Sequence, residues 1–152
     1  MNSGKKNNKK LSRGFTLIEV VLSITILIMI FTVAAPIYQD YQIRNNLDIS
    51  ASTIVENLRR AQVLSEAVDG DSTWGVNVSS GIVTLFKGPN FAGRDPSFDE
   101  TTDLPSAISP TGLTEIVFSK LTGEPDSVGI LTLSTNINVR TISINEKGIL
   151  TY

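Results

Sequence analysis

An uninterrupted apolar segment near the amino end constrains this chain more than any other feature. Phe15 to Ala35 comprises 21 residues, and Glu19 is the only charged one among them. At a rise of about 1.5 Å per residue, a helix of this length spans roughly 31 Å, enough to cross the hydrocarbon layer of a membrane. A carboxylate inside such a helix costs on the order of 2 to 3 kcal/mol unless it is neutralised or paired. We therefore expect Glu19 to have a partner.

The residues before this segment are basic and almost devoid of apolar side chains. Met1 to Gly14 holds five basic residues and no acidic one. The positive-inside rule predicts that this end stays in the cytoplasm and that the chain beyond the helix lies outside. A secretory signal peptide would be cut after the apolar segment, but Ala34-Ala35-Pro36 is a weak site because the segment exceeds the usual ~7 to 15 residues. Gly14 is the better cleavage candidate.

The junction at Gly14 resembles that of a known family. Its residues match the type IV pilins and the pseudopilins of type II secretion and DNA-uptake machines: Gly14, Phe15, Thr16, Leu17, Ile18 and Glu19. The resemblance implies that a prepilin peptidase on the cytoplasmic side cuts after Gly14 and methylates the new amino terminus at Phe15. It also implies that Pro36, where many pilins have a proline, kinks the helix.

Charge pairing explains why the family pattern includes Glu19. Removal of the leader creates an ammonium group at Phe15, and the Glu19 carboxylate of one subunit can neutralise this group on a neighbour inside a shared apolar core. Either charge left unpaired there costs several kcal/mol, so the pair favours one register between subunits. The alternative is a plain single-pass anchor with Glu19 among the lipid headgroups. It explains the topology but not the Arg13-Gly14-Phe15 junction.

Composition separates a basic leader from an acidic exported part. Without the first 14 of its 152 residues, the chain keeps 138 residues with 8 basic and 15 acidic side chains, a formal charge of −7. Cysteine and histidine are absent, so the exported part has no disulfide, in contrast to many pilins, and lacks the commonest nucleophile, general base and transition-metal ligands. We expect no enzyme, no catalytic residue, no cofactor and no metal site.

Beyond Pro36 the pattern becomes that of an amphipathic helix. Apolar residues recur mostly at intervals of three and four: Leu47, Ala51, Ile54, Leu58, Ala61 and Val68. Asp69-Gly70-Asp71 is expected to end the helix, because glycine readily adopts the left-handed conformation at that point. The expected organisation is a leader at 1–14, a transmembrane and assembly helix at 15–36, an amphipathic helix at 37–70 and a β domain at 71–152.

The remainder shows the two-residue period of β-strands. Strands are expected at 73–78, 82–87, 115–120, 128–134, 139–145 and 149–152, the first two forming a hairpin over Ser79-Ser80-Gly81. A helix followed by antiparallel strands predicts an α+β fold, with a long amino-terminal helix packed on an antiparallel sheet. Gly88 to Pro110 is expected to be a long irregular loop. Its acidic residues leave a calcium site as an alternative to a solvated loop, although the spacing matches no EF-hand.

Short motifs in the exported part resemble one subgroup, the minor pilins and pseudopilins of the GspH or FimT type. They are Leu58-Arg59-Arg60-Ala61-Gln62, Trp74-Gly75-Val76, Arg140-Thr141-Ile142-Ser143-Ile144 and Lys147-Gly148. Ordinary packing is the alternative for each: a core tryptophan, a turn glycine and a solvated strand arginine. Some FimT-type proteins capture DNA, so DNA binding through Arg140 and Lys147 is an alternative function, although 15 acids dilute the cations.

The sequence thus predicts a structural subunit of a type IV pilus or pseudopilus, of the minor class that the subgroup resemblance implies, serving secretion, adhesion and motility, or DNA uptake. Its expected partners are prepilin peptidase, other filament subunits, an inner-membrane assembly platform and the membrane itself. We expect a single-pass protein of the cytoplasmic (inner) membrane, with Met1 in the cytoplasm and the carboxyl-terminal domain outside, which then enters a periplasmic or cell-surface filament.

Overall fold

The computed structural model describes residues 14–152, apart from the side chains of residues 33–36. The chain divides into two compact units, Met1–Gln39 and Asp40–Tyr152. One helix, α1 (Leu17–Glu66), contributes to both units. Its first half lies in the first unit, and its second half belongs to the second, which also contains all the strands. Each unit is described separately below.

In the second unit, α1 turns an apolar stripe toward the strands. The expected stripe is confirmed between positions 47 and 61: Leu47, Ala51, Ile54, Leu58 and Ala61 are buried. The helix ends at Glu66, so Val68, which was expected to extend the stripe, lies beyond it with a left-handed φ of 53°. A short 3₁₀ turn, η1 (Asp69–Asp71), follows, and it includes the glycine that was expected to end the helix.

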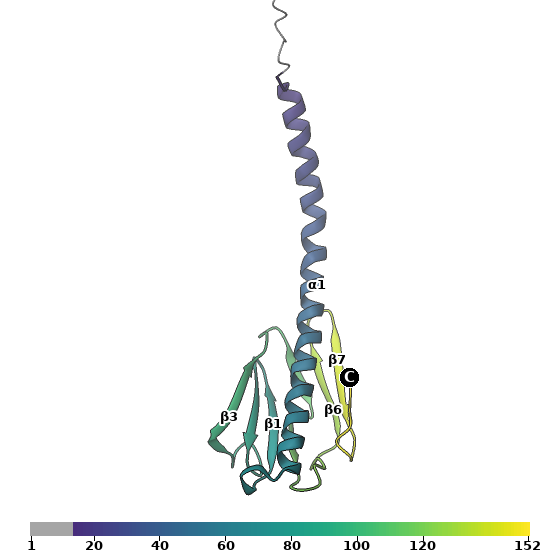
Figure 1. Cartoon of the computed structure of the whole chain (residues 1–152). Helices are drawn as coiled ribbons and strands as arrows, with labels where there is room; N and C mark the ends of the chain where they lie inside the picture. Colours follow the sequence, from purple (N-terminus) through teal and green to yellow (C-terminus); the bar gives the residue numbers. More distant parts are fainter. Residues whose placement is uncertain (1–13) are drawn as a thin grey trace, which may run out of the picture. The chain divides into compact units, whose positions relative to one another are not determined.

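Within residues 14–152, eight strands form two antiparallel sheets of four. Sheet A has the order β3-β2-β1-β5 and consists of β1 (Trp74–Ser79), β2 (Ile82–Lys87), β3 (Asp95–Asp103) and β5 (Glu115–Phe118). Sheet B has the order β4-β6-β7-β8 and consists of β4 (Ser109–Gly112), β6 (Gly129–Ser134), β7 (Val139–Ile144) and β8 (Leu150–Thr151). Figure 1 shows β3 and β1 on one side of α1 and β6 and β7 on the other.

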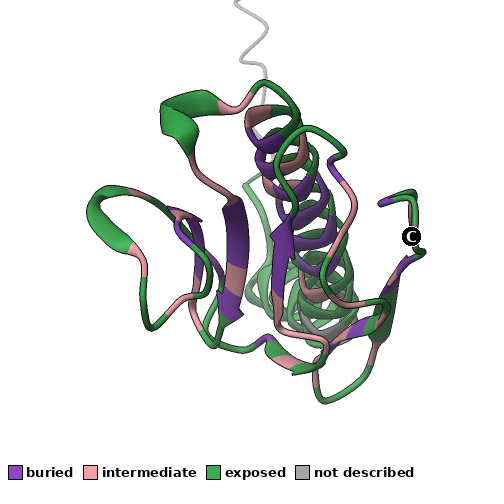
Figure 2. Cartoon of the chain, turned by 90° about the horizontal axis from the view of Figure 1, so that it is seen from below, coloured by how far each residue is buried: buried purple, intermediate pink, exposed green. Residues whose placement is uncertain are grey.

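The core lies where the inner faces of both sheets meet α1. Alternate residues of the strands supply it, including Val76 and Leu85 from sheet A and Leu131 and Ile142 from sheet B. Figure 2 shows these buried stretches facing the helix. The α+β fold, with a long amino-terminal helix packed on antiparallel sheet, is confirmed. Splitting of the strands into two sheets was not foreseen.

The β1–β2 hairpin follows the sequence expectation closely. Ser79 pairs with Ile82, which leaves Ser80 and Gly81 as a two-residue turn. Gly81 has a φ of +84°, a conformation that glycine adopts without steric cost. The hairpin therefore forms where the alternation of apolar residues is interrupted by a turn signal.

The expectation of a long irregular loop at Gly88 to Pro110 is wrong. This segment contains β3 and the start of β4. The strand β3 lies at the edge of sheet A, and eight of its nine residues are exposed and one is half-buried. Such a strand has no apolar alternation to reveal it in the sequence, because its backbone pairs with β2 while neither side of it is buried.

Candidate functional site

The start of α1 is closed by a threonine cap. The backbone N–H of Glu19 donates to the Thr16 hydroxyl over 3.3 Å and lies 3.1 Å from the Thr16 carbonyl oxygen. Thr16 thus satisfies a donor that the first turn leaves without a partner, and Glu19 stands in that turn near the positive end of the helix dipole. The Thr-x-x-Glu spacing is a known cap signal that could have identified Thr16 from the sequence.

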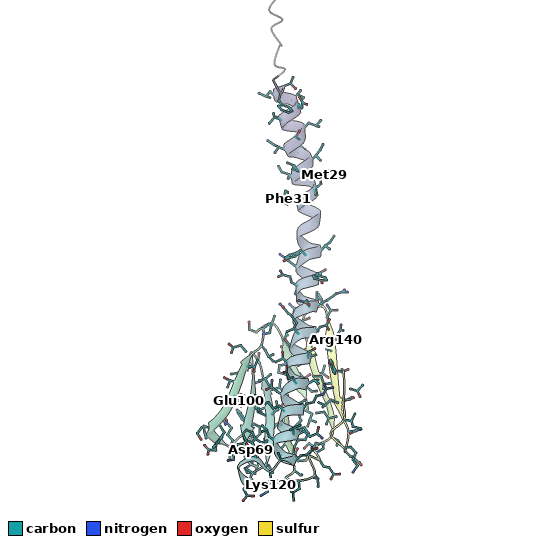
Figure 3. The ribbon with its side chains drawn as sticks, in the orientation of Figure 1. Met29, Phe31, Asp69, Glu100, Lys120 and Arg140 are labelled. Atoms are coloured by element: carbon teal, nitrogen blue, oxygen red, sulfur yellow. The ribbon has the colours of Figure 1, made fainter. Side chains whose placement is uncertain are left out.

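The first half of α1 presents its apolar side chains outward. Every side chain described from residue 14 to 32 is exposed, with Phe15 at 82% and Leu17 at 83%. Figure 3 shows Met29 and Phe31 projecting from the helix. The helix holds a stretch long and apolar enough to cross a membrane, by length and composition. An exposed apolar surface of this extent marks a site that meets lipid or other proteins.

The polar side chains within this helix are already satisfied. The hydroxyls of Ser23, Thr25 and Thr32 each donate to the carbonyl oxygen four residues earlier, over 2.7 to 2.8 Å. These donors therefore need no water, which suits a hydrocarbon environment. Glu19 differs from them, since its carboxylate forms no ion pair with any residue in the described part of the chain.

Two parts of the expected site fall outside what the structure describes. The leader up to Arg13 lies outside the described residues, so its cleavage remains a prediction. The helix α1 continues through position 36, but the side chain there is not described. The kink expected at Pro36 therefore also remains a prediction, based on the hydrogen bond that proline removes from a helix.

Arg140 and Lys147, the candidate DNA contacts, lie apart and each is neutralised. Arg140, near the start of β7, places Nε 2.6 Å from Oδ1 of Asp48 on α1. Lys147, past the other end of β7, lies 2.7 Å from Glu124, whose hydrogen bond and charge raise the pKa of the Lys147 ammonium. Phosphate binding would have to compete with these carboxylates. The DNA-binding alternative stays a prediction that a salt-sensitive gel shift would test.

The acidic residues considered for calcium belong to other contacts. Asp99 binds Arg94 and Glu100 binds Arg60 through two bonds of 2.6 Å. Figure 3 shows Glu100 on the side of sheet A. Between residues 14 and 152, no three His, Cys, Asp or Glu side chains are grouped as metal ligands. The structure provides no ligand cluster for the calcium alternative.

Two of the subgroup motifs, which are far apart in the sequence, meet in space. Gln62 on α1 donates through Nε2 to the carbonyl oxygens of Gly123 and Lys147, over 3.0 and 3.4 Å. A Cβ added at Gly148 would lie 2.5 Å from the Gln62 amide nitrogen, and Gly148 has a φ of +71°. Trp74 is buried and donates to the Asp69 carbonyl oxygen over 3.0 Å. Gln62 thus joins the end of α1 to the last turn, whereas Trp74 fastens the start of β1 to the segment that follows α1.

Comparisons with known proteins agree with both halves of this description. Residues 9–35 match a family model described as the prokaryotic N-terminal methylation motif. The fold is similar to the minor pseudopilin EpsH from the type 2 secretion system of Vibrio cholerae, with a TM-score of 0.51 at 13% identity. That match covers 70% of this chain and 94% of the EpsH chain. No curated protein sequence matches this chain.

The motif and the fold carry separate information. The motif covers the Gly14-Phe15 junction and the apolar segment that follows, whereas the structural likeness, at 13% identity, shows the fold of the chain alone. The chain thus has the prokaryotic N-terminal methylation motif over residues 9–35 and a fold similar to that of a minor pseudopilin.

Proposed function

We propose that this protein is a minor subunit of a type IV filament, inserted in the cytoplasmic membrane as a prepilin and then drawn into the filament through α1. The observation that carries the proposal is the exposed apolar half of α1, with Glu19 as its only charge. Such a surface is stable in lipid or against other apolar helices but not in water. The likeness to EpsH favours a secretion pseudopilus as the filament.

Processing would create an ion-pair partner for Glu19, which has none in the described part of the chain. A prepilin peptidase, acting after Gly14, would leave a methylated ammonium at Phe15, two residues before α1 begins at Leu17 and four residues before Glu19. In the filament this ammonium would meet the Glu19 carboxylate of a neighbouring subunit. Because both charges would be out of water, only the register that pairs them avoids a cost of several kcal/mol. An assembly platform in the inner membrane would supply the extraction.

Substitution of Glu19 tests this role. E19A should leave membrane insertion intact, since it removes a charge from an apolar segment, yet reduce the amount of protein in sheared filaments by roughly tenfold or more, as expected for an unpaired buried ammonium. The matched control is E146A, which removes an exposed carboxylate from the turn after β7. Equal incorporation of E19A and E146A would overturn the proposal.

Substitution of Gly14 tests processing separately. A Cβ at position 14 meets no atom within 4 Å, so a side chain there leaves the described fold undisturbed. G14V should accumulate as the uncut prepilin in the membrane, visible by mass as retention of the 14-residue leader. Full cleavage of G14V would show that the junction is not the peptidase site.

A further inference from the structure

The outer face of sheet A is covered by the chain itself where β2 lies, although the edge strand β3 stays exposed. Phe86 points away from α1 yet is fully buried, because the segment between β2 and β3 folds over it. The Phe91 ring meets Phe86 edge-on at 5.6 Å, and the Arg94 guanidinium lies 3.8 Å above the Phe91 ring. Glu115 on β5 holds this cover by accepting from the Phe91 N–H over 2.8 Å. The largest apolar side chain on the outer side of sheet A, Phe86, is therefore buried by the chain itself.

The outer face of sheet B has no such cover among the described residues. Thr111, Thr132 and Thr141 stand side by side across β4, β6 and β7. Beside this row lie Ile130, Ser134 and Ser143, and together these six residues form what we call the hydroxyl face. All six are exposed or half-buried, and none is charged. Charged residues are depleted at the centres of protein interfaces, which sets this face apart from the rest of an acidic domain.

Three hydroxyls of the hydroxyl face are already hydrogen-bonded within their own sheet. The Ser134 hydroxyl donates to the Ser109 carbonyl oxygen over 3.2 Å, and the Ser143 hydroxyl donates to that of Thr151 over 3.4 Å. Thr111 makes a similar bond to the Thr132 carbonyl oxygen at 3.5 Å. A partner need not supply acceptors for these three hydroxyls, whereas the hydroxyls of Thr132 and Thr141 donate to no group in the described part of the chain. Two open donors among six uncharged residues suit a protein partner, because protein interfaces form about one hydrogen bond per 100–200 Å².

One edge of the same sheet is open. The short strand β8 pairs only with Ser143 and Ile144, so β7 from Val139 to Ile142 has β6 on one side and no strand on the other within the described part of the chain. The edge strand β3 of sheet A carries four acids and a proline, which discourage pairing with another strand. In the open stretch of β7 the only charged residue is Arg140, and its guanidinium forms an ion pair with Asp48. The edge and the hydroxyl face adjoin.

We infer that the hydroxyl face and the adjoining β7 edge contact the globular domain of the adjacent subunit in the filament, an inference that rests on the proposed function. The mature chain has a formal charge of −7, so neighbouring acidic domains repel unless they meet through uncharged surfaces. The hydroxyl face is three strands wide and three rows of residues long, so its area is on the order of 300 Å². A stable complex between free proteins buries ~800 Å² on each partner. This face therefore suits a neighbour already held by helices, not a dimer in solution.

Thiol labelling of the full-length protein tests the contact, because the chain has no cysteine of its own. T132C places one thiol in the centre of the hydroxyl face, and T101C places one on the exposed outer side of β3 as the matched control. In detergent-extracted subunits, a maleimide should label both. In sheared filaments, labelling of T132C should fall by about tenfold, as expected for a desolvated interface, while labelling of T101C stays unchanged.

A charge on the hydroxyl face provides the second measurement. T132D should enter filaments about tenfold less than wild type, because a carboxylate would be buried there without a partner, whereas T101D should enter normally. Equal labelling of T132C in filaments and in extracted subunits would overturn the inference, as would normal entry of T132D. If T132C were already protected from maleimide in extracted subunits, something other than a filament neighbour would cover the hydroxyl face. That result would also overturn the inference.

The two proposals fail in different ways. If E19A is excluded from filaments while T132D enters and T132C stays reactive toward maleimide, the proposed filament function is supported. The inferred contact through the hydroxyl face is then wrong. If the wild-type protein is absent from filaments, both fall together. Size-exclusion chromatography of the extracted wild-type protein should show no dimer that T132D disrupts, and such a dimer would contradict the choice of a filament neighbour.

Discussion

Sheet A and sheet B have the same number of strands and turn their inner faces to the same helix, yet their outer faces differ. Sheet A buries Phe86 under Phe91 and Arg94, and its edge strand β3 is rich in acids. Sheet B leaves a neutral face of threonine, serine and isoleucine exposed and one edge partly open. The difference indicates that the chain itself buries the apolar outer side chain of sheet A, whereas the neutral outer face of sheet B is available to a neighbouring subunit. Substitutions on the two outer faces should therefore differ in what they change.

The largest effect is expected from F86A. Phe86 is fully buried beneath the cover of sheet A, so truncation would lose its apolar contacts and leave a cavity. We expect a loss of about 3 to 5 kcal/mol in the free energy of unfolding, measured by denaturant titration. A loss below about 1 kcal/mol would show that the cover collapses onto the space or that sheet A is not closed in this way.

F91A should have an intermediate effect. This change removes the edge-on contact with Phe86 and the cation–π contact with Arg94, but the strands of sheet A remain paired. We expect a loss of about 1 to 2 kcal/mol in stability, together with binding of a hydrophobic dye to the uncovered Phe86. The more conservative F91L should recover the part of the stability that comes from burying Phe86, but little of the cation–π contribution. Comparison of F91A with F91L therefore separates the apolar contribution of residue 91 from its aromatic contacts.

A smaller and pH-dependent effect is expected at Asp95, where β3 begins. Hydrogen bonds from the Ser97 hydroxyl and the Ser97 N–H lower the pKa of the Asp95 carboxyl. A carboxyl with a lowered pKa in the folded state stabilises at pH values above its unfolded pKa of about 3.9, and this contribution is lost as the pH falls through the folded pKa. Wild type should thus exceed D95N slightly in melting temperature near neutral pH, and the gap should close in acid. A gap that widens in acid would contradict the assignment.

The smallest change in stability is expected from T132V on sheet B. The Thr132 hydroxyl makes no hydrogen bond to another described residue as donor, and its side chain is half-buried, so exchange for the similarly shaped valine should alter stability by less than about 0.5 kcal/mol. Filament incorporation should also be retained, in contrast to T132D. Loss of incorporation by T132V would show that the neighbouring subunit recognises the Thr132 hydroxyl itself, through a hydrogen bond or a bridging water.

The same contrast explains which parts of the fold could be foreseen. The β1–β2 hairpin was predicted because its apolar residues alternate and Ser80-Gly81 interrupts them. The edge strand β3 was missed because it buries no side chain and so leaves no period in the sequence. Gln62 and Gly148 could be singled out by motif, but their contact could not, since no pattern states which loop will meet a helix end. Thr16 was missed although its spacing to Glu19 was a readable cap signal.

By itself, the sequence determined the apolar helix, the lone charge at Glu19 and the basic leader, because each is a local property of composition along one segment. It also determined that helix precedes strands. Only the tertiary structure decided that the strands form two sheets, that Arg140 and Lys147 are held by Asp48 and Glu124, and that one outer face is covered while the other is bare. These outcomes depend on contacts between segments far apart in the chain, whose loop lengths and packing no local pattern encodes.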